Sequence, residues 1–258
     1  MGFKENFEKW TVPAGKIGVV WLGQAGFMFK LPDGRKIILD PYITDYTYKA
    51  IGEPGFIRMT APLFAPDEIG VDYIFSSHEH PDHLDIDALP GLSGGNAKVF
   101  ANMDTVNAAK AAGLEIKNLT VIKTGDVVEQ DVFKVFAMKA DHGELAPNAM
   151  GFIFDFGYIK VYYSGDTCYN KEVLSPAVNM HPEVALLPIN GAFGNLNAVD
   201  AALLARDLGS KVCIPHHFWT FPAHNAVNGD PMTAVKYFPE IAPGCELKLT
   251  TPGALLEF

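Results

Sequence analysis

The sequence predicts an α+β fold in which two mixed β-sheets lie face to face with helices outside them, a four-layer αββα sandwich. Two observations lead to this expectation. Short strand-like runs alternate with helical segments, and each half of the chain begins with strands and ends with βα units. No linker or low-complexity stretch interrupts the 258 residues, so we expect a single domain that covers residues 1–258.

The first half opens with three short runs that are rich in apolar and β-branched residues and are separated by turns containing glycine. This pattern predicts an antiparallel meander. One helix is expected over 103–112, because Gly113 follows it as a helix stop. Residues 41–65 show no clear periodicity and are typical of a functional loop. The strands of this half are expected at 16–22, 25–31, 35–40, 72–77 and 119–122.

The second half repeats the order of strands followed by βα units. Gly157 separates two of the strand-like runs and predicts a hairpin. Helices are expected over 198–208, ended by Gly209, and over 232–238. The strands are expected near 132–137, 151–156, 158–163, 184–188, 212–215, 247–249 and 254–258.

Composition excludes several classes of protein. The chain is 48% hydrophobic and 19% charged, as globular proteins are, and its formal net charge is −10. No basic run is long enough to follow a phosphate backbone, so we expect a small-molecule substrate and no nucleic acid as partner. The three cysteines fit a reducing compartment, and neither a secretory signal nor an apolar run of membrane-spanning length is visible. We therefore expect a cytoplasmic protein without a membrane partner, and the sequence leaves a homo-oligomer open.

The strongest chemical signal follows the strand expected at 72–77. His78, His80, Asp82 and His83 lie at the spacing H-x-H-x-D-H, and imidazole and carboxylate are the groups that bind zinc, manganese or iron. Residues two apart in an extended chain point the same way, so His78 and His80 can bind one ion. The bend at Pro81 lets Asp82 and His83 face a second. A polar loop with unrelated histidines is disfavoured, because three of only 8 histidines fall within six residues.

This run resembles the signature of the metallo-β-lactamase superfamily. The resemblance implies the metallo-β-lactamase variant of the αββα fold and further ligands in a fixed order. His142 matches the third ligand of the first metal, and Asp166 matches the carboxylate that bridges both metals. The last ligand lies in a Pro-any-His-aromatic pattern followed by Thr-Phe. His217 fits that pattern better than His216, although the sequence alone leaves both open.

The resemblance implies two divalent metal ions, Mn²⁺ or Zn²⁺, and a hydroxide that bridges them. Such ions lower the pKa of bound water from about 15.7 to roughly 7 and polarise the bond under attack. Asp82 and Asp166 are the expected catalytic residues, with Asp166 or a neighbouring carboxylate relaying a proton to the leaving group. Second-sphere carboxylates should hold the imidazoles in the right tautomer. The candidates for this task are Asp40, Asp85 and Asp141.

Nearly the whole chain also resembles the L-ascorbate-6-phosphate lactonase-like branch of the superfamily. The resemblance rests on the runs 21–27, 39–42, 76–85, 163–167 and 187–191, and on Arg58 ahead of Pro62 and Pro66. It implies a hydrolase that opens a lactone, the cyclic ester of a sugar acid. Arg58 and Asn190 are the candidate substrate-binding residues, since a phosphorylated substrate needs a cation and hydrogen-bond donors. Surface solvation and turn formation are the alternative interpretations of these two residues.

Other functions remain as alternatives. A phosphodiesterase of the same fold would use the same metals, although the acidic charge disfavours a nuclease. An oxygen-reducing di-iron enzyme is disfavoured because its branch replaces the second histidine of the cluster by an acid, whereas His80 is intact here. A catalytically dead scaffold or ligand sensor would have lost metal ligands, and none is lost.

Overall fold

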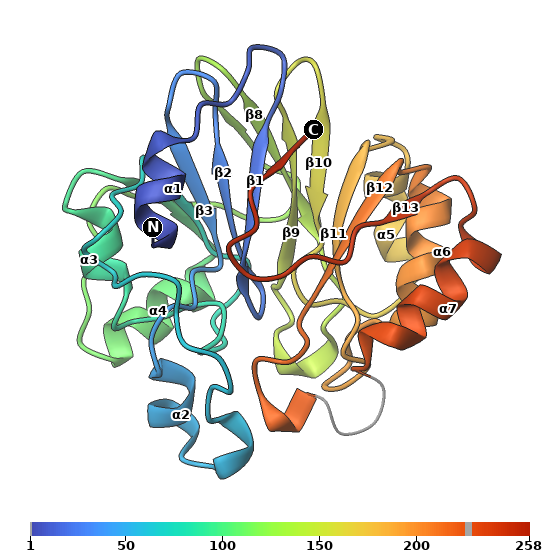
Figure 1. The fold of residues 1–258 in the computed structure, drawn as a ribbon. Coiled ribbons are helices and arrows are strands. Elements are labelled where there is room, and N and C mark those ends of the chain that lie inside the picture. The colour runs from blue at the N-terminus through green and yellow to red at the C-terminus, as the bar shows by residue number, and fades with distance from the viewer. Residues whose placement is uncertain (1, 225–228) are drawn as a thin grey trace. The chain divides into compact units, whose positions relative to one another are not determined.

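The computed structural model describes residues 2–224 and 229–258. The chain divides into two compact units. Unit 1 comprises residues 1–122 and 251–258, and unit 2 comprises residues 123–250. Each unit contains a seven-stranded mixed sheet with helices (Figure 1). The predicted α+β class with two mixed sheets is confirmed, while a single domain over 1–258 stays a prediction.

The sheet of unit 1 has the strand order β14-β1-β2-β3-β4-β5-β6. Strands β1, β2 and β3 form the predicted antiparallel meander, and β3 to β6 are parallel neighbours in chain order. The strands are β1 Gly18–Gly23, β2 Gly26–Lys30, β3 Lys36–Leu39, β4 Tyr73–Phe75, β5 Lys98–Ala101, β6 Leu119–Val121 and β14 Leu256–Glu257.

The helices of unit 1 lie in the connections between its strands and at its N-terminal end. Parallel strands that follow one another in order require crossovers of one hand, which places the connecting helices on one face of the sheet. The core on that face joins strand residues such as Val20 and Ile74 to Phe7 and Leu92 of the helices. The helices are α1 Phe3–Lys9, α2 Tyr46–Ile51, η1 Pro54–Phe56, α3 Leu89–Ser93 and α4 Met103–Ala111.

The sheet of unit 2 has the order β13-β12-β11-β10-β9-β8-β7. The predicted hairpin is the antiparallel pair β9 and β10, and Gly157 between them has a φ of +82° that a non-glycine residue rarely adopts. Strands β10 to β13 are parallel neighbours in chain order. The strands are β7 Val127–Glu129, β8 Lys134–Lys139, β9 Met150–Asp155, β10 Lys160–Tyr163, β11 Val184–Pro188, β12 Val212–His216 and β13 Glu246–Leu247.

Helices α5 Lys171–Val178, α6 Ala198–Leu208 and α7 Pro231–Ile241 connect these parallel strands, and two 3₁₀ turns, η2 Gly143–Leu145 and η3 Pro222–His224, lie in loops. The predicted helix 198–208 is confirmed. It begins there because the Asn197 side chain accepts from the backbone N–H groups of Val199 and Asp200, and it ends at Gly209 in the left-handed region. No helix in the described part of the chain has both the length and the apolar character needed to cross a membrane.

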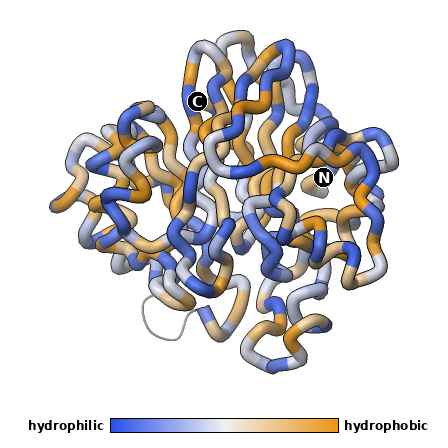
Figure 2. The backbone as a smooth tube through the Cα atoms, turned by 180° about the vertical axis from the view of Figure 1, so that it is seen from behind, coloured by the Kyte–Doolittle hydropathy of each residue, from blue (hydrophilic) through white to orange (hydrophobic). Residues whose placement is uncertain are grey.

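Several short elements differ from the sequence prediction. The segment 41–65, expected to be irregular, contains α2 and η1, and neither α1, α3 nor α5 is predicted. Each of these helices has at most 8 residues, little more than two turns, which is shorter than the window over which an amphipathic period can be recognised. Figure 2 shows the same difficulty, since hydrophobic and hydrophilic residues alternate over short distances along the backbone.

Candidate metal ligands

The H-x-H-x-D-H cluster of unit 1 lies directly after the carboxyl end of β4. This strand is flanked by parallel neighbours, and the crevice beyond the carboxyl ends of parallel strands is where α/β sheets bind ligands. The backbone N–H groups of His83 and Leu84 both donate to the carbonyl of His80 and close a tight turn at Pro81. His78 and His83 are fully buried, so their imidazoles are removed from bulk water.

Asp40, at the end of β3, holds the imidazoles of this cluster in place. Its Oδ2 accepts from Nδ1 of His83 at 2.6 Å and from Oγ of Ser77 at 2.5 Å. Because the Ser77 hydroxyl donates to Asp40, its oxygen is left to accept from Nδ1 of His78, at 2.9 Å. Both histidines therefore carry their proton on Nδ1, which leaves the Nε2 lone pairs available to a metal.

Asp40 thus does what the sequence analysis expected of a second-sphere carboxylate, whereas the role of Ser77 was not anticipated. Asp40 is fully buried and has a φ of +40°, an unfavourable conformation for a residue other than glycine. A strained, buried carboxylate that faces imidazoles is typical of a functional site. The only trace of it in the sequence is the position of Asp40 at the end of a strand.

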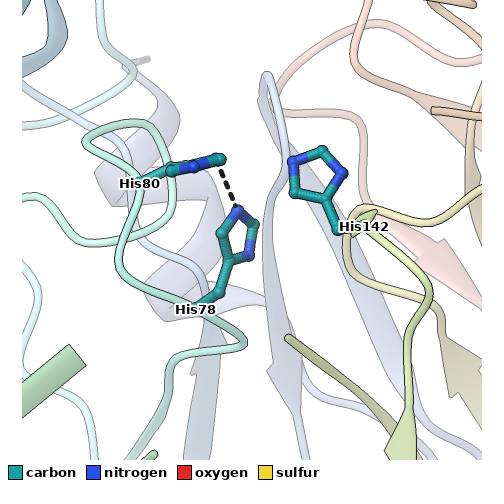
Figure 3. A group of neighbouring side chains, drawn as sticks. All are labelled: His78, His80 and His142. Atoms are coloured by element: carbon teal, nitrogen blue, oxygen red, sulfur yellow. Dashed lines mark hydrogen bonds between the residues drawn. The ribbon is translucent and has the colours of Figure 1, made fainter. Parts of the chain in front are cut away.

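His78 and His80 lie as two ligands of one ion would lie. Their Nε2 and Nδ1 atoms are 3.0 Å apart, and two nitrogens bound tetrahedrally at about 2.0–2.1 Å from an ion would be about 3.3 Å apart. Figure 3 shows the two rings with this contact drawn as a dashed line. A second possible group of metal ligands in this unit comprises Asp40, His78 and His83.

Asp82 receives a hydrogen bond from a side chain that the sequence analysis treated only as part of a turn. Nε2 of Gln24 donates to Oδ2 of Asp82 at 2.9 Å, and the same carboxylate oxygen lies 3.7 Å from Nε2 of His83. Gln24 is fully buried at a φ of +50°, and its carbonyl accepts from the indole N–H of Trp21. The buried Gln24 side chain, on strained backbone, orients the Asp82 carboxylate through Oδ2, so Oδ1 of Asp82 is the candidate metal ligand.

Arg58, the candidate substrate residue, stacks over the ring of Tyr42 with 4.5 Å from Cζ to the ring centroid. Its Nη1 donates to the Tyr42 carbonyl at 2.9 Å. Burial raises the pKa of Tyr42 to about 12; among the smaller influences, the charge of Arg58 lowers it and that of Asp82 raises it. Tyr42 therefore lies within electrostatic range of both Arg58 and the cluster.

The other two carboxylates proposed as partners for imidazoles have different contacts. Asp85 accepts from the backbone N–H groups of Ile43 and Thr44 and fixes the loop after β3. Burial raises its pKa. Asp141 accepts from Nδ2 of Asn170 at 2.7 Å, and this bond lowers its pKa. Both contacts organise loops rather than imidazoles.

Unit 2 carries the remaining predicted ligands on three loops at the carboxyl ends of its strands. His142 precedes η2, Asp166 follows β10, and His217 directly follows β12. Oδ1 of Asp166 lies 3.1 Å from Nε2 of His217, and Oδ2 lies 3.7 Å from Nε2 of His142. All three side chains are buried. Two imidazoles thus converge on one carboxylate, as they do where a carboxylate and two histidines share a metal.

The structure separates the two candidates for the last ligand. His217 faces Asp166, whereas the ring of His216 stacks on Tyr163 at 5.6 Å between centroids. His217 has a φ of +69°, a left-handed backbone conformation, so the chain turns sharply at this residue. The geometry agrees with the choice of His217, whose role as ligand stays a prediction.

Three asparagines lie in the loop between β11 and α6: Asn190, Asn195 and the capping residue Asn197. Nδ2 of Asn195 donates to Oδ2 of Asp166 at 2.9 Å. Asn190 follows β11 and is almost fully buried, and neither atom of its side-chain amide has a hydrogen-bond partner among the described residues. A buried amide without partners costs free energy unless a ligand satisfies it, which fits the substrate role that the sequence analysis gave Asn190.

These residues fit divalent metal ions. The donors are imidazole nitrogens and carboxylate oxygens without cysteine, a set that suits manganese and zinc equally. In unit 1 a buried carboxylate fixes the tautomer of two histidines, and in each unit an amide fixes an aspartate. Such supporting bonds around ligand side chains are characteristic of metal sites.

Comparisons with known proteins agree with this chemistry. The β-lactamase superfamily domain matches residues 18–217. A "UPF0173 metal-dependent hydrolase" of Aeropyrum pernix is 31% identical over 255 residues, which cover 93% of this chain and 97% of that protein. A protein of the same name from Herpetosiphon aurantiacus is 29% identical and covers 83% and 86%.

Solved structures share the fold. Isothiocyanate hydrolase from Delia radicum gut bacteria superposes with a TM-score of 0.74 at 17% identity and covers 93% of this chain and 98% of its own. Igni18, a metallo-hydrolase of Ignicoccus hospitalis, has a TM-score of 0.70 at 22% identity, with coverage of 94% and 98%. Both are similar in fold across almost their full lengths.

Proposed function

The chain belongs to the β-lactamase superfamily and, within it, to the UPF0173 metal-dependent hydrolases, and from this premise we propose that it hydrolyses a lactone of a sugar acid with the help of divalent metal ions. The superfamily predicted from the histidine cluster is thereby confirmed. The lactone, the number of metal ions and their identity belong to the proposal.

The observation that carries the proposal is the preparation of the ligand side chains within each unit. The Nε2 lone pairs of His78 and His83 are set by Asp40, directly or through Ser77. We assign metal binding to these prepared side chains of both units. The assigned ligands are His78, His80, Asp82, His83, His142, Asp166 and His217.

Bound divalent ions would supply an activated water and polarise the carbonyl of the substrate. The chain's own residues do the rest. An amide donor contacts one oxygen of Asp82 and another contacts one oxygen of Asp166, which fixes the orientation of both carboxylates. In the proposed reaction Asp166 takes a proton from the attacking water and passes it to the alkoxide that leaves when the ring opens.

The substrate class is supported by two features. Arg58 uses Nε and Nη1 on the carbonyls of Thr60 and Tyr42, and its guanidinium has further N–H groups to bind a phosphate or carboxylate. Asn190 provides a buried amide for a hydroxyl group. Each of these groups by itself suits a small polar sugar acid, and the net charge of −10 disfavours long polyanions.

A phosphodiesterase is the second candidate, because the same ligands serve it equally well. The test compares hydrolysis of L-ascorbate-6-phosphate with that of bis(p-nitrophenyl) phosphate by protein loaded with Mn²⁺ or Zn²⁺. We expect the parent to open the lactone. The rate should fall by roughly 10²–10⁴-fold in Asp82→Ala. In Arg58→Ala the loss of activity should come mainly from a higher KM. Activity on the phosphodiester alone would contradict the lactonase proposal and leave the metal ligands standing.

Two controls separate chemistry from folding. Asp33→Ala removes an exposed aspartate that pairs with Arg35 on the surface of unit 1 and should leave activity unchanged. Metal content of Asp82→Ala, measured by elemental analysis of purified protein, should be lower than in the parent. An Asp82→Ala protein that keeps its full metal content would remove Asp82 from the ligand set.

A further inference from the structure

His224, in the 3₁₀ turn η3, contacts the candidate ligand His217. Its Nδ1 lies 3.1 Å from Nδ1 of His217, and the two rings stack with centroids 4.8 Å apart and planes inclined by 17°. His224 is almost fully buried. In the sequence it follows His217 by seven residues and resembles an ordinary loop histidine.

The pairing of two ring nitrogens restricts the tautomers. When two neutral imidazoles meet through nitrogen atoms, one nitrogen must carry a proton and the other must offer a lone pair. His217 has Nε2 turned to Asp166, at 3.1 Å, on the opposite side of its ring. For His217 to offer Nε2 as a lone pair to a metal, its proton must sit on Nδ1 and be donated to His224.

We propose that His224 is a positioning residue that fixes His217 as the Nδ1–H tautomer and so prepares Nε2 for metal binding. This inference rests on the proposed function, in which His217 binds metal. His224 then carries its own proton on Nε2 and accepts through Nδ1. It does for His217 what the carboxylate of Asp40 does for His83, but without adding a negative charge.

The surroundings of His224 hold it in this place. Its ring packs against Phe193 at 5.4 Å and edge-on against Phe221 at 5.2 Å. Its backbone N–H donates to the carbonyl of Phe221. A Cβ atom on Gly229 would lie 2.1 Å from the His224 carbonyl oxygen, so the chain beyond the turn passes too close for any side chain there. A residue packed this tightly pays little entropy to hold one orientation.

The experiment uses the full chain and two readouts. Two-bond ¹H–¹⁵N correlation spectra of the Zn²⁺-loaded protein report which nitrogen of His217 and of His224 carries a proton, and titration with Zn²⁺ alone reports metal affinity. The variant His224→Phe keeps an aromatic ring but no nitrogen. His224→Asn keeps an acceptor oxygen close to the position of Nδ1. His181→Phe, at an exposed histidine of the same unit, is the matched control.

In the Zn²⁺-loaded parent we expect a proton on Nδ1 of His217 and, on His224, a proton on Nε2, because Nδ1 of His224 accepts from His217. Zn²⁺ affinity should fall about 10–100-fold in His224→Phe, as it does when outer partners of ligands are removed, and should largely return in His224→Asn. His181→Phe should change neither readout.

Three results would overturn the inference: a proton on Nδ1 of His224 in the Zn²⁺-loaded parent, unchanged Zn²⁺ affinity in His224→Phe, or a loss in His224→Asn as large as in His224→Phe. A parent protein that binds no Zn²⁺ or Mn²⁺ would instead refute the proposed function. Because metal binding by the parent is measured before the variants are compared, the two failures are distinguishable.

Discussion

The two units support their candidate ligands in one respect alike and in another differently. In each, a side-chain amide donates to an aspartate at 2.9 Å: Gln24 to Asp82 in unit 1 and Asn195 to Asp166 in unit 2. The imidazoles differ. A buried carboxylate orients His83 in unit 1, whereas a second imidazole contacts His217 in unit 2.

The difference shows that a protein can orient several imidazoles for metal binding without adding a negative charge for each of them. A carboxylate makes the stronger hydrogen bond and raises the basicity of the ligand, but a buried charge is costly when metal is absent. An imidazole fixes the tautomer with no net charge. We therefore expect changes at Asp40 to affect stability and metal binding together, and changes around His224 to affect mainly metal binding.

The largest effect is expected for Asp40→Asn. Asparagine has the shape of aspartate and tolerates a positive φ, but it carries no charge. An NH₂ group cannot replace both carboxylate oxygens as an acceptor, so at least one buried donor loses its partner. We expect the free energy of unfolding to fall by about 2–4 kcal/mol and metal content to be lost. Urea unfolding and elemental analysis measure these changes.

Asp33→Asn, on the surface of unit 1, is the control for this prediction and should change stability by less than about 0.5 kcal/mol. An Asp40→Asn variant as stable as the control would remove the contrast between the two units, since the charge of Asp40 would then contribute nothing.

Gly229→Ala tests the corresponding region of unit 2. The added Cβ would overlap the His224 carbonyl oxygen, so the turn must shift. We expect a loss of about 1–3 kcal/mol in unfolding free energy, as overpacking usually causes, and weaker Zn²⁺ binding. Gly244→Ala, where a Cβ meets nothing within 4 Å, is the matched control. Equal behaviour of the two alanine variants would contradict the assigned packing around His224.

Tyr42 gives a pH-dependent test in unit 1. Its pKa is raised to about 12 by burial, against 10.0 for an ordinary tyrosine. Below pH 10 both states keep the proton. Between pH 10 and 12 the unfolded chain loses it and the folded chain does not, so the free energy of unfolding falls by up to about 1.4 kcal/mol per pH unit.

In Tyr42→Phe this part of the alkaline loss should disappear. The measurement is denaturant unfolding at pH 9 and pH 11 for the parent and the variant. Tyr162→Phe provides the comparison in unit 2, because burial raises the pKa of Tyr162 as well. Identical pH dependence in the parent and in Tyr42→Phe would show that Tyr42 ionises in the folded protein as readily as in the unfolded chain.

The smallest effect is expected for the two amides. Gln24→Asn retains a residue that tolerates positive φ but is one methylene too short to reach Asp82, and Asn195→Ala removes the donor to Asp166. Each substitution should lower the free energy of unfolding by about 0.5–1.5 kcal/mol and weaken the free energy of Zn²⁺ binding by a similar amount. Isothermal titration compares them. A large loss of stability or of Zn²⁺ affinity in one variant alone would show that the two amide contacts share a length of 2.9 Å but not an energetic role.

The elements that the sequence predicted best are those whose signals are local. The helix 198–208 has a capping asparagine and a terminal glycine, and the hairpin around Gly157 has two apolar runs separated by one left-handed residue. Helices α2 and α3 escaped prediction because each is about one and a half turns long, too short to show a pattern of its own. Leu89 and Leu92 of α3 pack into the core of unit 1, whereas Thr47 is the buried residue of α2.

The candidate ligands were predictable for a related reason. His78, His80, Asp82 and His83 fall within six residues, so spacing alone brings them together. Gln24, Ser77 and His224 could not be found in this way. No local spacing marks these three residues as functional. Their importance comes from the contacts that their side chains make in the folded chain.

Periodicity and turn residues, which are local properties of the chain, were enough to predict the α+β class. The H-x-H-x-D-H spacing marked four candidate ligands, and the resemblance that it carries implied the superfamily and the ligands His142, Asp166 and His217. How these side chains are held could be seen only in the tertiary structure. The contact of Asp40 with His83 spans 43 residues, and the structural support for His217 over His216 is its contact with Asp166. Hydrogen bonds between remote residues and left-handed backbone conformations arise from packing, and no local pattern specifies them.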